Sequence, residues 1–137
     1  MRCKSDALRW VERAKNFYKS SGKRISLAEF TNPHGPFVED QMYVYVLSCK
    51  GTMLAHGVNE KWVGEDFMNL KDAEGKFFIK EIVETANSQG NGWVDYKWFE
   101  PSTRKMLPKN VYFEKIDEVI ICSGIYNFNS NSKSHKA

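Results

Sequence analysis

The stretch QMYVYVLSCKGTMLAHGV, residues 41–58, contains the clearest strand pattern of this chain. From Gln41 to Cys49 apolar side chains occupy both faces of a two-residue alternation, which predicts a strand that is buried on both sides and central in its sheet. One face holds Met42, Val44 and Val46, and the other holds Tyr43, Tyr45 and Leu47. A tight turn at residues 50–52 then leads to a second strand over Met53–Val58, so the two strands form a hairpin.

Three more strands are predicted after this hairpin, over residues 92–99, 107–115 and 118–126. The segments that join them are short, which is typical of antiparallel neighbours. With the hairpin, they predict a sheet of five antiparallel strands.

Two helices are predicted before the hairpin in the sequence. Over residues 5–21 apolar side chains recur at steps of three and four, which predicts an amphipathic helix that ends at Gly22. A second, short helix is predicted to begin with a capping box formed by Ser26 and Glu29, and Asn32-Pro33 should end it.

A helical crossover is predicted between the hairpin and the last three strands. Residues 59–70 have irregularly spaced apolar side chains, and Asp72 is predicted to cap a helix that ends near Gly90. The fold class predicted from these elements is α+β: a long N-terminal helix followed by a five-stranded antiparallel sheet with a helical crossover, an architecture that resembles the PAS-like sensor folds.

Charge and cysteine spacing exclude several classes of partner. The formal net charge is +3, and without Lys133 and Lys136 there remain 18 basic and 17 acidic side chains. This balance lacks the concentrated basic surface that DNA or RNA binding requires, so we expect no nucleic-acid partner. Cys3, Cys49 and Cys122 do not have the spacing of a zinc, thioredoxin or haem motif, so we expect neither a metal nor another cofactor.

The length fits one domain. We expect residues 1–24 to form the N-terminal helix of the domain, residues 25–128 its ligand-binding body, and the polar residues 129–137 a disordered tail. Residues 1–21 are charged throughout and no apolar run is long enough to span a bilayer, so we expect neither a signal peptide nor membrane contact from this segment.

Eight short segments in a fixed order resemble the single Cache domain family, type 2. They are NPHGPF at 32–37, YVYV at 43–46, GTMLAH at 51–56, VG at 63–64, LKDAEGKF at 70–77, GWVDY at 92–96, PKNVY at 108–112 and GIY at 124–126. The resemblance implies a PAS-like sheet with a pocket over one face, in an extracytoplasmic sensor domain of chemoreceptors and histidine kinases. It also implies small organic acids as ligands, of the acetate, propionate, pyruvate or lactate class. The chain departs from the family at Gly57, where proline is usual, and at His34, where lysine or another polar residue is common.

Two polar residues are the main candidates for contact with a carboxylate. His56 ends the second strand and can donate a hydrogen bond or, if protonated, supply a charge, but it could equally be a core histidine bonded to a backbone carbonyl. Lys109 shares a strand face with Val111 and Phe113, so it needs either an anionic partner or a path to water. The resemblance favours the ligand role for both residues.

Aromatic residues make up 14% of the chain and could supply pocket walls and phenolic donors. The candidates are Tyr43, Tyr45, Trp93, Tyr96 and Tyr112, while Trp98 and Tyr126 are expected to be walls or core. An aromatic side chain on a strand more often packs in a core, so only some of them should reach a ligand. Cys49 and Cys122 lie on strands that are neighbours in PAS-like sheets, and buried reduced thiols are expected rather than a disulfide.

The functional prediction is therefore a ligand-binding sensory domain for a small organic acid, acting in signal transduction or chemotaxis. It is not expected to be an enzyme, because the sequence has no nucleophile elbow, zinc-protease helix or phosphate loop. The alternatives are a structural or interaction module without a ligand and, less favoured, a small enzyme. From the resemblance alone we expect a stand-alone periplasmic or extracytoplasmic domain, with a homodimer through the N-terminal helix as a further expectation.

Overall fold

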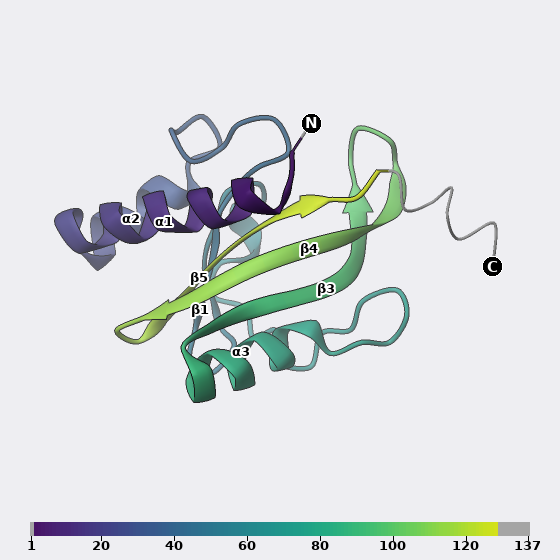
Figure 1. The fold of residues 1–137 in the computed structure, drawn as a ribbon. Helices are drawn as coiled ribbons and strands as arrows, with labels where there is room; N and C mark the ends of the chain where they lie inside the picture. Colours follow the sequence, from purple (N-terminus) through teal and green to yellow (C-terminus); the bar gives the residue numbers. More distant parts are fainter. Residues whose placement is uncertain (1, 129–137) are drawn as a thin grey trace.

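Five antiparallel strands form a sheet in the order β2-β1-β5-β4-β3 (Figure 1). The computed structural model describes residues 2–128. The strands are β1 (Tyr45–Ser48), β2 (Met53–His56), β3 (Asn91–Glu100), β4 (Lys105–Ile116) and β5 (Val119–Tyr126). The helices are α1 (Lys4–Ser21), α2 (Lys23–Thr31), the 3-10 helix η1 (Glu60–Trp62) and α3 (Phe78–Gln89). The α+β class and the five-stranded antiparallel sheet are confirmed.

The sheet separates two apolar cores, because successive side chains of a strand point to opposite faces. Val44 and Val46 pack with α1 and α2 on one face, whereas Tyr45 and Leu47 pack with α3 on the other, as the alternation predicts. Figure 1 shows α1 and α2 on one side of the sheet and α3 on the opposite side. The face that α3 covers carries the candidate site.

Both hairpin strands are shorter than predicted. Met42 is paired with Glu39 in a local turn, which delays the start of β1 to Tyr45. β2 ends at His56: the N–H of Gly57 still donates to the carbonyl of Val44, but those of Val58 and Asn59 donate to the His56 side chain instead of to a strand.

The first two helices meet at Gly22, and this junction overturns the predicted capping box. Gly22 has a φ of 87°, which glycine adopts without strain, and its carbonyl accepts the first helical bond from the N–H of Ser26. The helix therefore starts three residues earlier than predicted, at Lys23. Ser26 lies inside it, buried, and its hydroxyl has no hydrogen-bond partner among the described residues.

Asp72 is not a helix cap, which corrects a second prediction. α3 begins only at Phe78. The Asp72 carboxylate accepts backbone N–H groups from Glu74, Lys76 and Lys97, so it fastens the crossover loop to β3 instead.

Candidate ligand cavity

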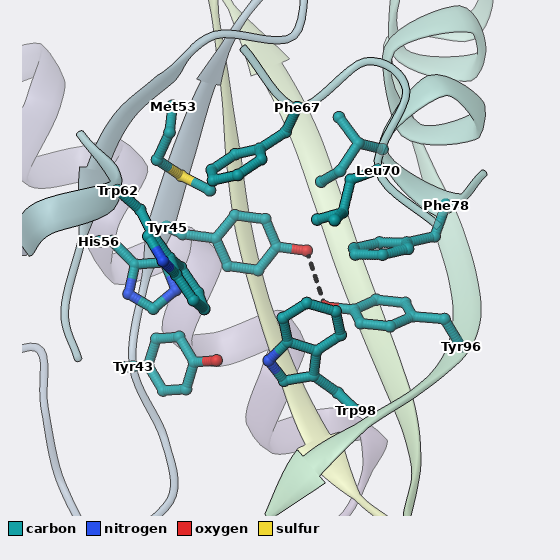
Figure 2. A pocket seen from close by; sticks show the side chains of 11 residues that line it. Tyr43, Tyr45, Met53, His56, Trp62, Phe67, Leu70, Phe78, Tyr96 and Trp98 are labelled. Atoms are coloured by element: carbon teal, nitrogen blue, oxygen red, sulfur yellow. Dashed lines mark hydrogen bonds between the residues drawn. The ribbon is translucent and has the colours of Figure 1, made fainter. Parts of the chain in front are cut away.

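A cavity of about 160 Å³ lies between the sheet and the crossover segment (Figure 2). Aromatic rings form most of its wall, and its polar surface consists of phenol, imidazole and indole groups. The lining residues are Tyr43, Tyr45, Met53, His56, Trp62, Phe67, Leu70, Phe78, Ile79, Tyr96 and Trp98. No aspartate or glutamate is among these described residues. The cavity therefore offers apolar contact and hydrogen-bond donors, but no negative charge.

A second, larger cavity of about 800 Å³ adjoins the first. The two cavities share Tyr43, His56, Trp62 and Trp98, so they are adjacent; the smaller is called the inner cavity and the larger the outer cavity. Two carboxylates line the outer cavity, and both already have partners within the protein. Asp40 forms an ion pair with Arg2, and Glu100 accepts hydrogen bonds from residues 102 and 103.

Two phenols meet at the back of the inner cavity. The hydroxyls of Tyr45 and Tyr96 are 3.1 Å apart and hydrogen-bonded, as the dashed line in Figure 2 marks. Phe78, the first residue of α3, stacks on Tyr96 with ring centroids 3.8 Å apart. Burial raises the pKa of both tyrosines, so they stay neutral donors and acceptors.

Lys109 is a cationic side chain in the core, with only 1% of its surface exposed. Its ammonium donates to the Tyr43 hydroxyl over 2.7 Å and lies against the rings of Tyr43, Tyr45 and Tyr126, at 4.4, 5.9 and 5.0 Å from their centroids. Within residues 2–128 no carboxylate forms an ion pair with it. Desolvation lowers the pKa of Lys109. Burying a cation without an anionic partner costs several kcal/mol in general, and ring contacts return roughly 2 kcal/mol when desolvated.

His56 is 4% exposed and lies between the rings of Tyr43, Tyr45 and Trp62. Its Nδ1 atom accepts the backbone N–H groups of Val58 at 3.1 Å and Asn59 at 2.9 Å. Desolvation and the positive charge of Lys109 lower the pKa of His56 to about 3. The imidazole is therefore neutral at physiological pH and does not supply the charge that protonation would give.

The structure places four of the predicted site residues on the inner cavity: Tyr43, Tyr45, His56 and Tyr96. Lys109 lines neither cavity; its ammonium donates to the hydroxyl of Tyr43, which lines both. These five residues come from the segment that contains β1 and β2 and from β3 and β4, which lie on opposite sides of β5 in the sheet.

Trp93 and Tyr112 line neither cavity, which corrects their predicted position. They are paired across β3 and β4 and lie on the α1 face, where Lys4 covers the Trp93 ring and Tyr112 donates to Glu114. Strand alternation is the reason. Val111 and Phe113 face the cavity side, so Tyr112 between them faces away, and Trp93 likewise alternates with Val94.

Several lining residues were not among the predicted site. Trp98 shares a strand face with Tyr96, so alternation alone could have placed it there. Trp62, Phe67 and Leu70 come from the irregular crossover, whose sequence has no periodicity from which a direction can be predicted.

Cys3, Cys49 and Cys122 are free thiols; Cys122 is buried as predicted, whereas Cys49 is only partly buried. Cys122 is buried on β5, where desolvation raises the pKa of its thiol well above the ordinary value. Cys49 donates to the carbonyl of Glu118 instead of approaching Cys122.

Among residues 2–128 no group of three or more His, Cys, Asp or Glu side chains is arranged to hold a metal ion. None of the described helices has the length and apolar character needed to cross a bilayer.

The antiparallel sheet, the flanking helices and the cavity over one face define a PAS-like α+β fold. Residues 14–134 match the family model described as Single Cache domain 2, and the chain belongs to this family. Members are sensor domains of chemoreceptors and histidine kinases, with a ligand-binding sensory role and not an enzymatic one.

Individual relatives agree with this assignment. A sensor histidine kinase of Rhizobium johnstonii, MctS, is 28% identical over 86 residues, which are 61% of this chain and 18% of the kinase. The chain thus spans less than a fifth of that relative. A periplasmic sensor domain of a chemotaxis protein superimposes with a TM-score of 0.66 at 23% identity, covering 89% of this chain and 88% of the other. A Cache chemosensory domain described for carboxylic acid recognition superimposes with a TM-score of 0.67 at 22% identity, covering 89% and 86%.

Proposed function

We propose that this domain binds a small monocarboxylate in the inner cavity, with the ammonium of Lys109 neutralising the carboxylate, and that binding is the sensory event. The single observation that carries the proposal is the buried lysine without an anionic partner. A charge in such a place is destabilising unless something pairs with it. A carboxylate ligand would be that partner.

The rest of the cavity supports the same class of ligand. Donors surround it while acidic side chains are missing from its described lining, so an anion meets no repulsion there. Apolar walls from Phe67, Leu70 and Ile79 suit a short hydrocarbon tail, and a second carboxylate beside them would have no cation.

Size supports a ligand of a few heavy atoms. The inner volume of about 160 Å³ is below the roughly 300–1,000 Å³ of pockets for drug-sized molecules. The solved Cache domain described for carboxylic acid recognition is consistent with this proposal through its fold. A periplasmic location and dimerisation through α1 stay predictions.

The experiment is a thermal-shift screen of the purified domain against acetate, propionate, pyruvate, lactate and the dicarboxylate succinate. A ligand present at about 100 times its Kd contributes about 2.7 kcal/mol, so at least one monocarboxylate should raise the melting temperature by several degrees. Succinate should not.

Lys109→Met is the decisive variant, and Lys105→Met, at an exposed position of the same strand, is its matched control. Removing a charge-assisted contact is worth about 1.5–3 kcal/mol, so Lys109→Met should weaken binding by roughly 10- to 150-fold while Lys105→Met binds normally. If no acid shifts the wild-type protein, or if Lys109→Met binds as well as the control, the proposal is wrong. A module without a ligand would give the first result.

A further inference from the structure

The outer cavity differs from the inner one in charge and in size. Its aromatic lining residues are Tyr43, Trp62, Trp98, Phe99, Tyr126 and Phe128. Its described lining also contains two carboxylates and two amides, but no lysine or arginine. Three apolar side chains of this lining, those of Val58, Phe99 and Phe128, are 58%, 48% and 39% exposed. A volume of about 800 Å³ lies in the range of pockets for drug-sized molecules, so this cavity can hold a larger ligand than the inner one.

Glu100 is a buried carboxylate that has no cationic partner among the described residues. It follows Tyr96 and Trp98 at steps of two along β3, so its side chain is directed to the same face, and only 4% of its surface is exposed. Its hydrogen-bond donors are N–H and hydroxyl groups of Ser102 and Thr103, which carry no charge. Burial acts to raise the pKa of Glu100, but these hydrogen bonds outweigh it and lower the pKa, so the side chain is an anion at neutral pH.

Two oxygen atoms of the outer cavity can accept further hydrogen bonds. Oε1 of Glu100 accepts three, at 2.6, 2.7 and 2.8 Å, whereas Oε2 accepts only the N–H of Ser102, at 3.2 Å. A carboxylate oxygen has two lone pairs, so Oε2 can accept one more donor. The side-chain oxygen of Gln41 is buried and has no hydrogen-bond partner among the described residues. Both oxygens therefore suit a ligand that brings N–H donors.

Asp40 adds to the negative charge of this cavity. Arg2 pairs with both Glu39, at 2.9 Å, and Asp40, at 3.3 Å, so one cation serves two carboxylates. The ammonium of Lys109 contacts two rings of the wall but does not line the cavity. Carboxylates together with aromatic faces attract organic cations, through charge-assisted hydrogen bonds and cation–π contacts.

We propose that the outer cavity is a second binding site, which takes a primary organic ammonium ion with an aromatic or apolar substituent. The ammonium group donates to Oε2 of Glu100 and to the side-chain oxygen of Gln41. The substituent packs against the exposed rings of Phe99 and Phe128. This inference stands on the outer cavity alone and does not depend on the proposed function.

Calorimetric titration of the whole chain with 2-phenylethylammonium tests the class of ligand. The uncharged 2-phenylethanol has a similar shape and is the matched control. The cation should bind about tenfold more tightly than the alcohol, or better, because only the cation pairs with Glu100. Equal affinity for the two compounds, or no binding of the cation at millimolar concentration, would overturn the inference.

Two variants test the residues of the site. Glu100→Gln removes the charge and should lower the affinity for the amine about tenfold, whereas Glu84→Gln, at an exposed position of α3, changes the net charge equally and should have no effect. Glu100 also holds the turn at residues 101–104, so a melting curve checks the fold of its variant. Gln41→Met removes an oxygen that no described residue uses, so it should melt at or above the wild-type temperature and bind the amine roughly 2- to 10-fold more weakly. Unchanged affinity in Gln41→Met, or in folded Glu100→Gln, would refute the site.

Lys109→Met and a competition experiment distinguish the outer cavity from the inner one. Lys109→Met should bind the amine at least as tightly as the wild-type protein, because no contact of the second site involves the lysine and its removal lowers the positive charge nearby. A loss of amine binding in this variant would contradict the inference. The amine should also bind undiminished to protein saturated with a monocarboxylate, and competition between the two would show that the amine enters the inner cavity, which refutes the second site. If the amine binds and no acid does, only the proposed function fails.

Discussion

Lys109 is the residue in which stability and function conflict most clearly. Its stem fills space between strands, and its ammonium is held by one phenol and three aromatic rings. Those contacts compensate only part of the lost hydration. A fold selected for stability alone would place a hydrocarbon side chain here.

The apo protein should therefore gain stability when this amine is removed. Replacing buried charges by apolar side chains of similar volume is often neutral or stabilising by about 1–4 kcal/mol, so unliganded Lys109→Met should unfold at the same or a higher urea concentration than the wild-type protein. Urea denaturation in ligand-free buffer measures this. A clearly lower midpoint for Lys109→Met would show that the lysine supports the fold, which would remove the main reason to assign it a ligand.

At the scale of elements, the crossover is the part of the fold that closes the cavity. Phe67 and Leu70 form part of the wall, and the turn that follows is fastened to β3 through Asp72. Lys97, which donates the N–H, lies between Tyr96 and Trp98, so the attachment point is inside the cavity wall itself. Desolvation raises the pKa of Asp72, but its three backbone donors outweigh this effect and the pKa is lowered.

Asp72→Asn should loosen this closure. The amide keeps one acceptor oxygen for the turn, whereas its nitrogen cannot accept the N–H of Lys97. Leaving a part-buried N–H without its acceptor costs about 1–3 kcal/mol, so the urea midpoint should fall, and ligand affinity should fall a few-fold because the wall is less well ordered. Faster amide exchange over residues 64–76 would accompany this. Asp66→Asn, in the same crossover but without a bond to β3, is the control. Unchanged stability and affinity in Asp72→Asn would show that the loop is held by its apolar contacts alone.

The elements were predictable to the extent that their signals are local. The alternation at residues 41–49 correctly gave both faces of β1, and α1, β3, β4 and β5 start and end within about two residues of their predicted bounds. The capping pattern at Ser26 failed because α2 already begins at Lys23, directly after the non-helical residue Gly22, which no local pattern shows. The predicted helix cap at Asp72 was wrong for a related reason. The third hydrogen-bond partner of its carboxylate, the N–H of Lys97, is 25 residues away in the sequence.

The site was predictable only in part. Tyr43, Tyr45, His56 and Lys109 came from strand positions whose direction alternation defines, and the family resemblance selected among them. Trp93 and Tyr112 were assigned to the wrong face of the sheet because they were chosen for their aromatic character and not by the alternation of side chains along their strands. The crossover residues could not be assigned, since an irregular segment has no periodicity to give the direction of a side chain.

At the scale of the whole molecule, the two faces of one sheet carry two apolar cores with different roles. The α1 face is packed with hydrocarbon and supports the fold, while the α3 face leaves a cavity lined by hydrogen-bond donors, one of which, Tyr43, is bonded to the buried ammonium of Lys109. Ligand binding can act as a signal only if it favours one arrangement of this face over another. The crossover, attached to both the hairpin and β3, is the element through which such a change would spread.

The pH dependence of affinity tests the central claim that the ammonium of Lys109 binds the ligand's carboxylate. Between pH 6 and 10 the carboxylate stays ionised, and the other titratable side chains of the cavity do not change charge: the pKa of His56 is about 3, burial raises those of Tyr43, Tyr45 and Tyr96, and that of Tyr126 is about 12. Desolvation lowers the pKa of Lys109 from its ordinary 10.5, so its ammonium is the group of this site that loses its charge as the pH rises. The ligand binds the protonated form, so affinity is complete below the pKa of the free protein's lysine and is lost above it.

Calorimetric titration of the wild-type protein with its best monocarboxylate, repeated from pH 6 to pH 10, is the direct measurement. The account predicts a constant Kd at low pH, followed by weakening that approaches tenfold per pH unit and begins below pH 10. A Kd that stays constant up to pH 10 would contradict it.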